Sequence, residues 1–194
     1  MTSAIEAGIC LDQGALPSLS EQVIVDCCGG YYTHGCSGGS VIQAFDCVYD
    51  LVSMPYDSNY AYTAKKGTCK YTYGRYIPLY RSQPFYYSNK DGDGEDMLSF
   101  FVCYAPTIIA IAVPTNNDRF YMYRGGIIDE HTACGKTINH AVVAVGIGEE
   151  NGVPYWLVLN SWGTQWGEDG FVRIKRGDGI CSVGDYSVVP PMSH

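Results

Sequence analysis

Apolar positions in the first half of the chain recur at helical spacing in several short segments. Residues 3–12 carry apolar side chains about one helical turn apart, and residues 40–51 and 96–104 also have helical patterns. A further apolar group follows Ser18 and Ser20, and either serine is a suitable N-terminal cap for a helix. The pattern therefore predicts a series of short helices in the first part of the chain.

After Pro106 the pattern changes, and β-branched and apolar residues form continuous runs. These runs, which are typical of strands in a buried sheet, span residues 107–113, 138–147, 153–159 and 170–175. Residues 52–94, dense in Tyr, Pro, Gly and Asp, predict a long irregular segment that needs to be pinned. Helices followed by strands predict an α+β fold with segregated halves.

The overall charge narrows the range of partners. The 194 residues fit one domain, or one domain of two lobes, and their formal net charge is −8. This acidity argues against binding to nucleic acid, which requires a basic surface, and against adsorption to an anionic membrane. No apolar run approaches the roughly 18 residues of a membrane span. We therefore expect neither nucleic acid nor a membrane as a partner.

Nine cysteines are scattered along the chain without a CxxC pair, which argues against a zinc ribbon. Their number favours structural disulfides formed in an oxidising compartment, and the odd count leaves at least one of them without a partner in the chain. Residues 1–12 lack the basic and apolar regions of a signal peptide. The cysteine content is typical of a secreted protein, but the start of the chain is not. We therefore expect that the natural N-terminus lies upstream of Met1.

A histidine and an asparagine are predicted to meet across the hairpin formed by residues 138–147 and 153–159. If residues 149–152 form its loop, His140 lies opposite Ser161, beside Asn160, whereas a two-residue Asn-Gly turn shifts the register by about two residues. In either register Asn160 can accept a hydrogen bond from His140 and fix its tautomer. The alternative is a core histidine that a neighbour satisfies, without any chemistry.

Sequence blocks around these two residues, and others upstream, resemble the motifs of one family. They are Asn160-Ser161-Trp162-Gly163 with Trp166-Gly167, Asn139-His140-Ala141-Val142, Ser20-Glu21-Gln22 with Asp26-Cys27, Gly35-Cys36-Ser37-Gly38-Gly39, and Phe120 with Tyr123-Arg124-Gly125-Gly126-Ile127. In this order they resemble papain and the cathepsins, the papain family of cysteine peptidases. Trp162 and Trp166 are placed to exclude water from the hydrogen bond between His140 and Asn160.

The resemblance implies a papain-like two-lobed fold over residues 1–190, with a helical lobe at about 1–88 and an antiparallel, barrel-like β lobe at about 89–194. It also implies thiol-dependent peptide hydrolysis without a cofactor, in which a cysteine attacks and His140 and Asn160 assist. The family's cysteine precedes its histidine by about 130–150 residues, and alignment places it about five residues before Met1. Cys10 falls within this count, but its setting in a predicted helix favours a structural thiol.

The same resemblance implies roles for further residues. Disulfides are expected between Cys27 and Cys69 and between Cys134 and Cys181, while the expected partner of Cys36 lies outside the chain. Substrate contacts are implied for Gly38, Gly39, Val41, Ala110, Ala141, Trp162 and Tyr186. For the residues that line the specificity pocket, plain core packing is the alternative; Tyr186 at the pocket floor would favour medium apolar side chains.

Peptide or protein substrates and protein inhibitors are the partners that the resemblance implies, for a monomer in a lysosome, a vacuole or the extracellular space. The sequence is compatible with three alternatives. The chain is part of an active peptidase, a non-catalytic papain-like binding module, or a disulfide-rich structural protein. No metal is expected: Cys27, Cys28, His34 and Cys36 are better explained by disulfides, and residues 91–95 by a loop that caps a helix than by a calcium site.

Overall fold

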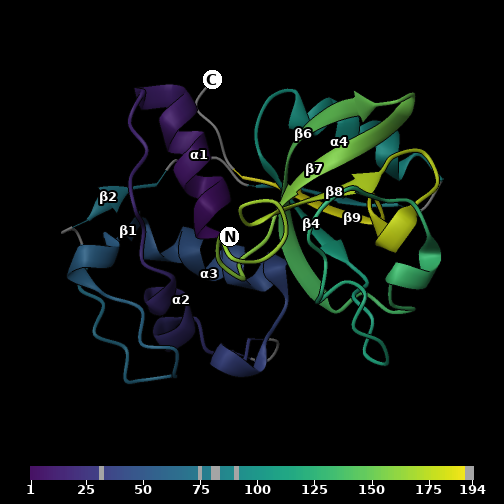
Figure 1. Ribbon diagram of the computed structural model, residues 1–194. Coiled ribbons are helices and arrows are strands. Elements are labelled where there is room, and N and C mark those ends of the chain that lie inside the picture. The colour runs from purple at the N-terminus through teal and green to yellow at the C-terminus, as the bar shows by residue number, and fades with distance from the viewer. Residues whose placement is uncertain (31–32, 74–75, 80–83, 90–91, 191–194) are drawn as a thin grey trace. The chain divides into compact units, whose positions relative to one another are not determined.

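The computed structural model describes residues 1–30, 33–73, 76–79, 84–89 and 92–190 (Figure 1). The chain divides into two compact units, the first formed by Met1–Phe85 with Pro190 and the second by Tyr86–Val189. Helices dominate the first unit and a large sheet dominates the second (Figure 1), so the fold is α+β as the sequence predicts.

Three helices form the frame of the first unit, and each corresponds to a predicted one. α1 (Thr2–Gln13) ends at Gly14, whose left-handed backbone (φ 70°) lets its N–H donate to the carbonyl of Cys10. α2 (Glu21–Cys27) begins at Ser20, whose hydroxyl accepts a hydrogen bond from the backbone N–H of Val23. α3 (Val41–Leu51) begins in the same way at Ser40. Ser20, rather than Ser18, is therefore the cap of the second helix.

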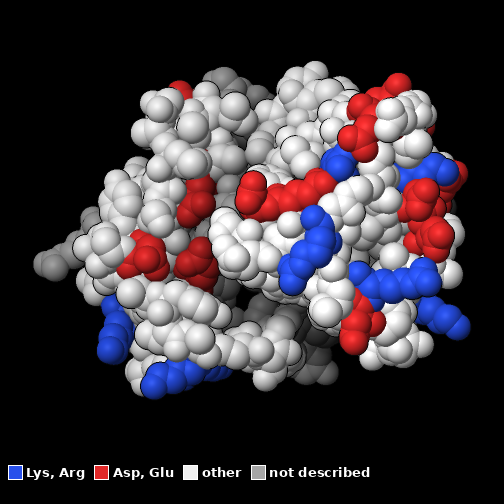
Figure 2. All heavy atoms as spheres, viewed as in Figure 1, with Lys and Arg blue, Asp and Glu red and all other residues white. Residues whose placement is uncertain are grey.

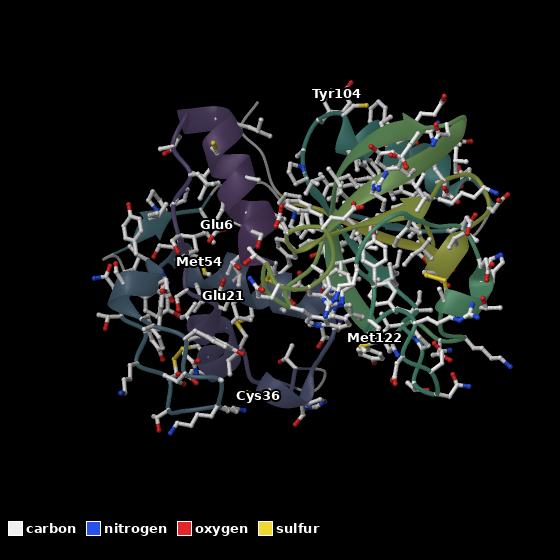
Figure 3. All side chains as sticks on the ribbon, viewed as in Figure 1. Glu6, Glu21, Cys36, Met54, Tyr104 and Met122 are labelled. Atoms are coloured by element: carbon white, nitrogen blue, oxygen red, sulfur yellow. A yellow bond between two sulfur atoms is a disulfide. The ribbon has the colours of Figure 1, made fainter. Side chains whose placement is uncertain are left out.

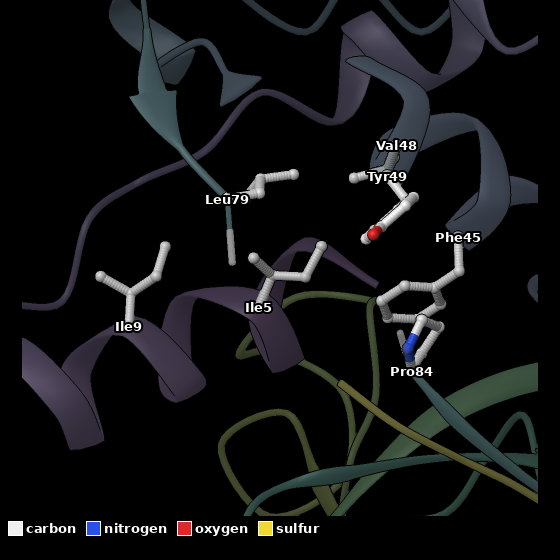
Figure 4. A pocket seen from close by; sticks show the side chains of 7 residues that line it. All are labelled: Ile5, Ile9, Phe45, Val48, Tyr49, Leu79 and Pro84. Carbon is white, nitrogen blue, oxygen red and sulfur yellow. The ribbon is translucent and has the colours of Figure 1, made fainter. Parts of the chain in front are cut away.

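Apolar side chains of α1 and α3 face one another around a small cavity of about 20 Å³ (Figure 4). The residues that line it are Ile5, Ile9, Phe45, Val48, Tyr49, Leu79 and Pro84. Glu6, also on α1 and labelled in Figure 3, accepts a hydrogen bond of 2.7 Å from the backbone N–H of Leu19. Burial raises the pKa of the Glu6 carboxyl above its usual range.

The long segment after α3 is mostly irregular, and α2 holds it. Its regular elements are β1 (Ser53–Met54), η2 (Asp57–Asn59) and β2 (Ile77–Pro78), with β1 and β2 paired antiparallel. Gln22 accepts from the N–H of Thr63 at 2.8 Å, and Asp26 accepts from the N–H of Gly67 at 2.6 Å. The hydroxyl of Tyr60 also donates to Asp26. Polar side chains of one helix thus replace the backbone pairing that the loop lacks.

The second unit contains a seven-stranded sheet in the order β3-β9-β4-β6-β7-β8-β5. Its strands are β3 (Phe85–Ser88), β4 (Thr107–Ile111), β5 (Ile127–Ile128), β6 (His140–Glu150), β7 (Val153–Leu159), β8 (Phe171–Lys175) and β9 (Tyr186–Val189). The β4–β6, β4–β9, β6–β7 and β7–β8 pairs are antiparallel, whereas β5 runs parallel to β8. The remaining elements are α4 (Gly94–Val102) and the short η1 (Gly35–Ser37), η3 (His131–Ala133) and η4 (Ile180–Ser182).

A tight turn joins β6 to β7 and decides between the two predicted registers. Glu150 pairs with Val153, so the turn consists of Asn151 and Gly152 alone, and both have positive φ. The two-residue alternative is therefore correct. Further along β6 the register shifts by one residue at Val145, between Ala144 and Gly146, which is a β-bulge.

One apolar core lies against this sheet. Alternate residues of the central strands point into it, among them Ile109, Val142, Ala144, Trp156 and Val158. α4 contributes Leu98, and its Glu95 accepts from the indole N–H of the fully buried Trp156 at 2.9 Å. The same carboxylate accepts from the backbone N–H groups of Gly177 and Gly179 at 2.7 and 2.6 Å. Glu95 thus ties the loop after β8 to the core.

Candidate functional site

His140 and Asn160 form a direct hydrogen bond at the end of the sheet. His140 begins β6 opposite Ile111, and Asn160 directly follows β7. Nε2 of His140 lies 2.9 Å from Oδ1 of Asn160, which also accepts from the backbone N–H of Ser161 at 2.8 Å. Because that oxygen can only accept, Nε2 carries the proton and Nδ1 is left for a second partner.

The backbone on each side of the pair is anchored. The side chain of Asn139 donates through Nδ2 to the carbonyl of Val113 and accepts at Oδ1 from the N–H of Val113, both at 2.9 Å. The N–H of Asn139 also donates to the carbonyl of Ile111. The N–H of Asn160 donates to the carbonyl of Gly170 at 3.0 Å, and the Asn160 side chain is buried. The imidazole and the amide are therefore carried on fixed strand ends.

An aromatic cluster lies beside the imidazole. The ring centroid of Trp162 is 5.2 Å from that of His140, with the planes tilted by 31°. Phe120 and Trp166, both buried, meet the indole of Trp162 edge to face at 5.8 and 5.1 Å. The predicted proximity of Trp162 to the pair is thus present, and Trp166 supports Trp162 from the core.

Three of the residues proposed to bind substrate lie in one row across the sheet. Ala110 pairs directly with Ala141, and the β4–β9 register, in which Ile109 pairs with Ser187, places Tyr186 across from Ala110 when continued by one residue. Ala110 is buried, whereas Ala141 is exposed and Tyr186 is half-buried. Burial raises the pKa of the Tyr186 hydroxyl.

Gly38, Gly39 and Val41 belong to the first unit. With residues of α2 and the start of α3 they line an apolar hollow of about 170 Å³. Gly38 has φ 91° and a carbonyl that accepts from the N–H of His34 at 2.9 Å. A side chain at this backbone conformation would be strained, so the glycine is required by the turn.

Six of the nine cysteines form disulfides. Two of the bonds, Cys27–Cys69 and Cys134–Cys181, are the pairs that the resemblance implies, while Cys28–Cys47 has no counterpart among the predicted pairs. Cys27 and Cys28 are therefore oxidised and unable to ligate a metal with His34 and Cys36. Cys36 is an exposed free thiol on η1 (Figure 3).

Cys10 and Cys103, the other free cysteines, lie towards the C-terminal ends of α1 and α4. Neither cysteine lies at a helix N-terminus, which is a position that favours a reactive thiol, so both are poor candidates for a nucleophile. For Cys10 this agrees with a structural thiol, although its side chain is half-buried rather than fully buried.

The acidic loop at residues 91–95 uses its described carboxylates within the protein. Asp91 lies outside the described residues. Asp93 accepts from the hydroxyl of Tyr87, and Glu95 is occupied by Trp156 and the loop at residues 177–179. Asp93 precedes α4 but makes no side-chain cap bond, and Glu95 and Asp96 occupy the helix's first turn. Throughout the described ranges, no three His, Cys, Asp or Glu side chains gather as a metal site would require.

The charge of the surface and the apolarity of the helices can be compared with the partners expected from the sequence. Figure 2 shows acidic side chains on the visible face of each unit. In the second unit basic side chains lie among them, in agreement with ion pairs such as Arg173–Glu168 and Lys175–Asp178. Among the helices that the structure describes, none combines the length and apolarity needed to cross a bilayer.

An α+β fold that carries a histidine–asparagine pair beneath a tryptophan defines a papain-like cysteine peptidase domain. The profile of the papain family of cysteine proteases matches residues 1–191, and the chain belongs to this family. Pro-cathepsin H of Bos taurus is 38% identical over 185 residues, which are 94% of this chain and 53% of the relative. Thiol protease aleurain of Arabidopsis thaliana is 37% identical, over 97% of this chain and 52% of the relative.

A solved structure shows the same fold. It is a cysteine protease of Carica candamarcensis in complex with E-64, 32% identical, with a TM-score of 0.84 over 100% of this chain and 86% of that protein. The fold is therefore papain-like. The chain spans about half the length of the curated relatives it matches.

Proposed function

We propose that His140 and Asn160 are the base and its orienting residue in a cysteine-type peptidase that hydrolyses peptide bonds. The observation that carries this proposal is the 2.9 Å hydrogen bond between Nε2 of His140 and Oδ1 of Asn160, in a chain of the papain family. The bond leaves Nδ1 available to a thiol, because Nε2 is already committed to the amide.

The proposed chemistry begins when Nδ1 of His140 takes the proton of a cysteine thiol. The thiolate attacks the carbonyl carbon of the peptide, and the tetrahedral intermediate expels the amine, which takes its proton from His140. Water then gives a proton to His140 and attacks the thioester, releasing the acid and restoring the thiol. Asn160 holds the ring in one orientation through these steps and stabilises its protonated form.

The nucleophile, in this proposal, comes from a segment of the parent protein outside residues 1–194. Cys10 and Cys103 lie towards the wrong ends of their helices, and Cys36 lies on the short η1. Residues 1–194 therefore hold the histidine and asparagine of the site, and we expect them to show no peptidase activity when expressed alone.

The proposal for substrate binding is made for each unit by itself. We expect Gly38 and Gly39 to hold substrate backbone in the manner of an added strand. In the second unit, the row Ala110, Ala141 and Tyr186 would line a specificity pocket, and Trp162 would contact substrate beside His140. In the first unit, Val41 is a further residue that we expect to contact substrate. The half-buried ring of Tyr186 favours medium apolar side chains over long basic ones.

The proposal also covers the cellular compartment, the oligomeric state and the binding partners. Three disulfides favour an oxidising compartment, for which a lysosome, a vacuole or the extracellular space is our proposal. We propose a monomer that acts on peptides or proteins and is blocked by inhibitors. The complex of the Carica candamarcensis protease with E-64 supports this last point by analogy.

The test is turnover of a peptide substrate by the full-length natural protein. His140→Ala should lower kcat by about 10²- to 10⁴-fold, the usual contribution of a general acid–base group. Asn160→Ala should lower kcat less, because the imidazole remains. His131→Ala is the matched control, since His131 is an exposed histidine on η3 of the same unit, and it should retain normal turnover.

Alkylation of the protein with iodoacetamide should abolish turnover, and peptide mapping should show that the loss follows modification of a cysteine other than Cys10, Cys36 and Cys103. Turnover that survives alkylation, or equal turnover in the His140→Ala and His131→Ala proteins, would overturn the proposal. A natural protein that binds peptides without cleaving them would support the alternative of a papain-like binding module.

A further inference from the structure

The exposed Tyr121 lies flat against the tryptophan that borders His140. The ring centroids of Tyr121 and Trp162 are 5.2 Å apart and their planes differ by only 9°, so the two rings are stacked. Trp162 in turn lies 5.2 Å from the His140 ring. The three rings form a continuous series, which we call the Tyr121–Trp162–His140 stack.

The neighbours of Trp162 differ in where they lie. Phe120 and Trp166 are 0% and 6% exposed and meet the indole at nearly right angles, whereas Tyr121 is 43% exposed and nearly parallel to it. Phe120 and Trp166 therefore hold the indole from the core, and Tyr121 is its aromatic neighbour on the solvent side. Stacked aromatic pairs stabilise one another beyond the effect of the area that they bury.

The position of Tyr121 is itself fixed. Its backbone carbonyl accepts a hydrogen bond of 3.0 Å from the indole N–H of Trp166. The next residue, Met122, donates its N–H to the carbonyl of Asp118 at 2.8 Å, which closes a turn around the tyrosine. A ring carried on a fixed backbone loses little conformational entropy when it stacks, which favours the contact with Trp162.

We propose that Tyr121 is a positioning residue that acts on His140 through Trp162. It holds the indole in place beside the imidazole, which keeps water away from the hydrogen bond between His140 and Asn160 and preserves the Nε2-protonated tautomer. This inference rests on the proposed function for its significance, but the physical effect on His140 exists whether or not the protein is a peptidase.

The test is ¹⁵N NMR of the histidine ring nitrogens in the full chain. Tyr121→Ala should raise the exchange rate of the His140 Nε2 proton with water by about 3- to 10-fold, which corresponds to the strength of one aromatic pair. It should also shift the Nδ1 and Nε2 resonances towards a mixture of tautomers. Tyr121→Phe keeps the ring and should leave both quantities as they are in the parent chain.

Tyr104→Ala is the matched control, because Tyr104 is another exposed tyrosine of the second unit, packed on Phe100 at 4.9 Å. Figure 3 shows Tyr104 and Met122 at different ends of this unit. The control should leave the His140 signals unchanged. If Tyr121→Ala gives the same exchange rate and tautomer as the control, Tyr121 has no positioning role, and that result leaves the peptidase assignment untouched because no turnover enters the measurement.

Discussion

In the first unit one disulfide joins the last residue of α2 to the long loop, and a second joins the residue after α2 to α3. Among the described residues of this unit, the sheet consists of the two-residue strands β1 and β2. The second unit has one disulfide but a seven-stranded sheet with a core that includes Trp156, Val158 and Ile174. Cross-links and polar side chains hold the loops of the first unit, whereas apolar burial holds the second. The long loop of the first unit is therefore the part most dependent on redox state and on single polar groups.

Among the changes proposed here, removal of the Cys27–Cys69 disulfide should produce the largest difference in amide exchange protection between the two units. A loop of 42 residues loses about 4 kcal/mol of cross-link stabilisation when the bond is absent. In the Cys27→Ser/Cys69→Ser protein we expect amide exchange protection to fall in α2 and residues 57–73, while β6 and β7 stay protected. Hydrogen exchange followed by mass spectrometry measures both regions together.

The Cys134→Ser/Cys181→Ser protein is the control for that comparison, because its loop of 47 residues is similar in length. There the neighbouring core should preserve protection in the central strands. Equal loss of protection in both units after removal of Cys27–Cys69 would show that the two units do not differ in this way.

Glu95→Gln should have the next largest effect, and it should act on the second unit. The substitution removes charge from an acceptor of three hydrogen bonds, and bonds to charged groups contribute about 1.5–3 kcal/mol. We expect a loss within that range in urea unfolding followed by tryptophan fluorescence. Glu149→Gln changes an exposed glutamate of the β6–β7 hairpin and should alter the midpoint little; a similar shift in both variants would contradict the role of Glu95.

The smallest expected effect is a dependence of stability on pH, which a different carboxylate causes in each unit. Burial alone would raise the pKa of Asp26, but hydrogen bonds from Gly67, Tyr60 and Gln22 outweigh it and lower the pKa. The hydrogen bonds with Arg173 are the main cause that lowers the pKa of Glu168 in the second unit. Because both folded-state pKa values lie below the unfolded ones, the stabilisation is present above about pH 4 and is lost as the pH falls through the folded-state values.

Urea midpoints compared at pH 7 and pH 3 measure this dependence. Asp26→Asn should reduce the acid sensitivity of the first unit, and Glu168→Gln should reduce that of the second. Each variant should leave the acid sensitivity of the other unit as it is. An unchanged pH dependence in both variants would assign the acid sensitivity to other groups.

The sequence predicts the elements that carry their own periodicity. The helices at residues 3–12, 40–51 and 96–104 and the long apolar strands are visible because their patterns are local. The short strands β3, β5 and β9 are missed, since two to four residues give no periodicity and β9 pairs with β4 from far along the chain. The predicted boundaries also differ slightly, as α4 begins at Gly94 and β6 extends to Glu150.

The features of the site also differ in whether the sequence predicts them. His140 and Asn160 are predictable because a hairpin brings them together in either register, and the family motifs mark them. The contact of Tyr121 with Trp162 and the disulfide Cys28–Cys47 depend on tertiary packing, for which adjacent residues give no signal. The role of Glu95 is missed for the same reason, since its partners lie more than sixty residues away.

The bulge at Val145 determines which insertions and deletions the β6–β7 hairpin can accept. One residue in β6 has no partner there, so the strand on either side of it follows a different numerical register with β7. An added pair of residues at the Asn151–Gly152 turn, one on each strand, lengthens the hairpin and leaves His140 where it is. A single insertion or deletion between His140 and Ala144 instead reverses the side chains of that segment, turning the imidazole away from Asn160. Natural variation in hairpin length should therefore accumulate beyond the bulge and be absent before it.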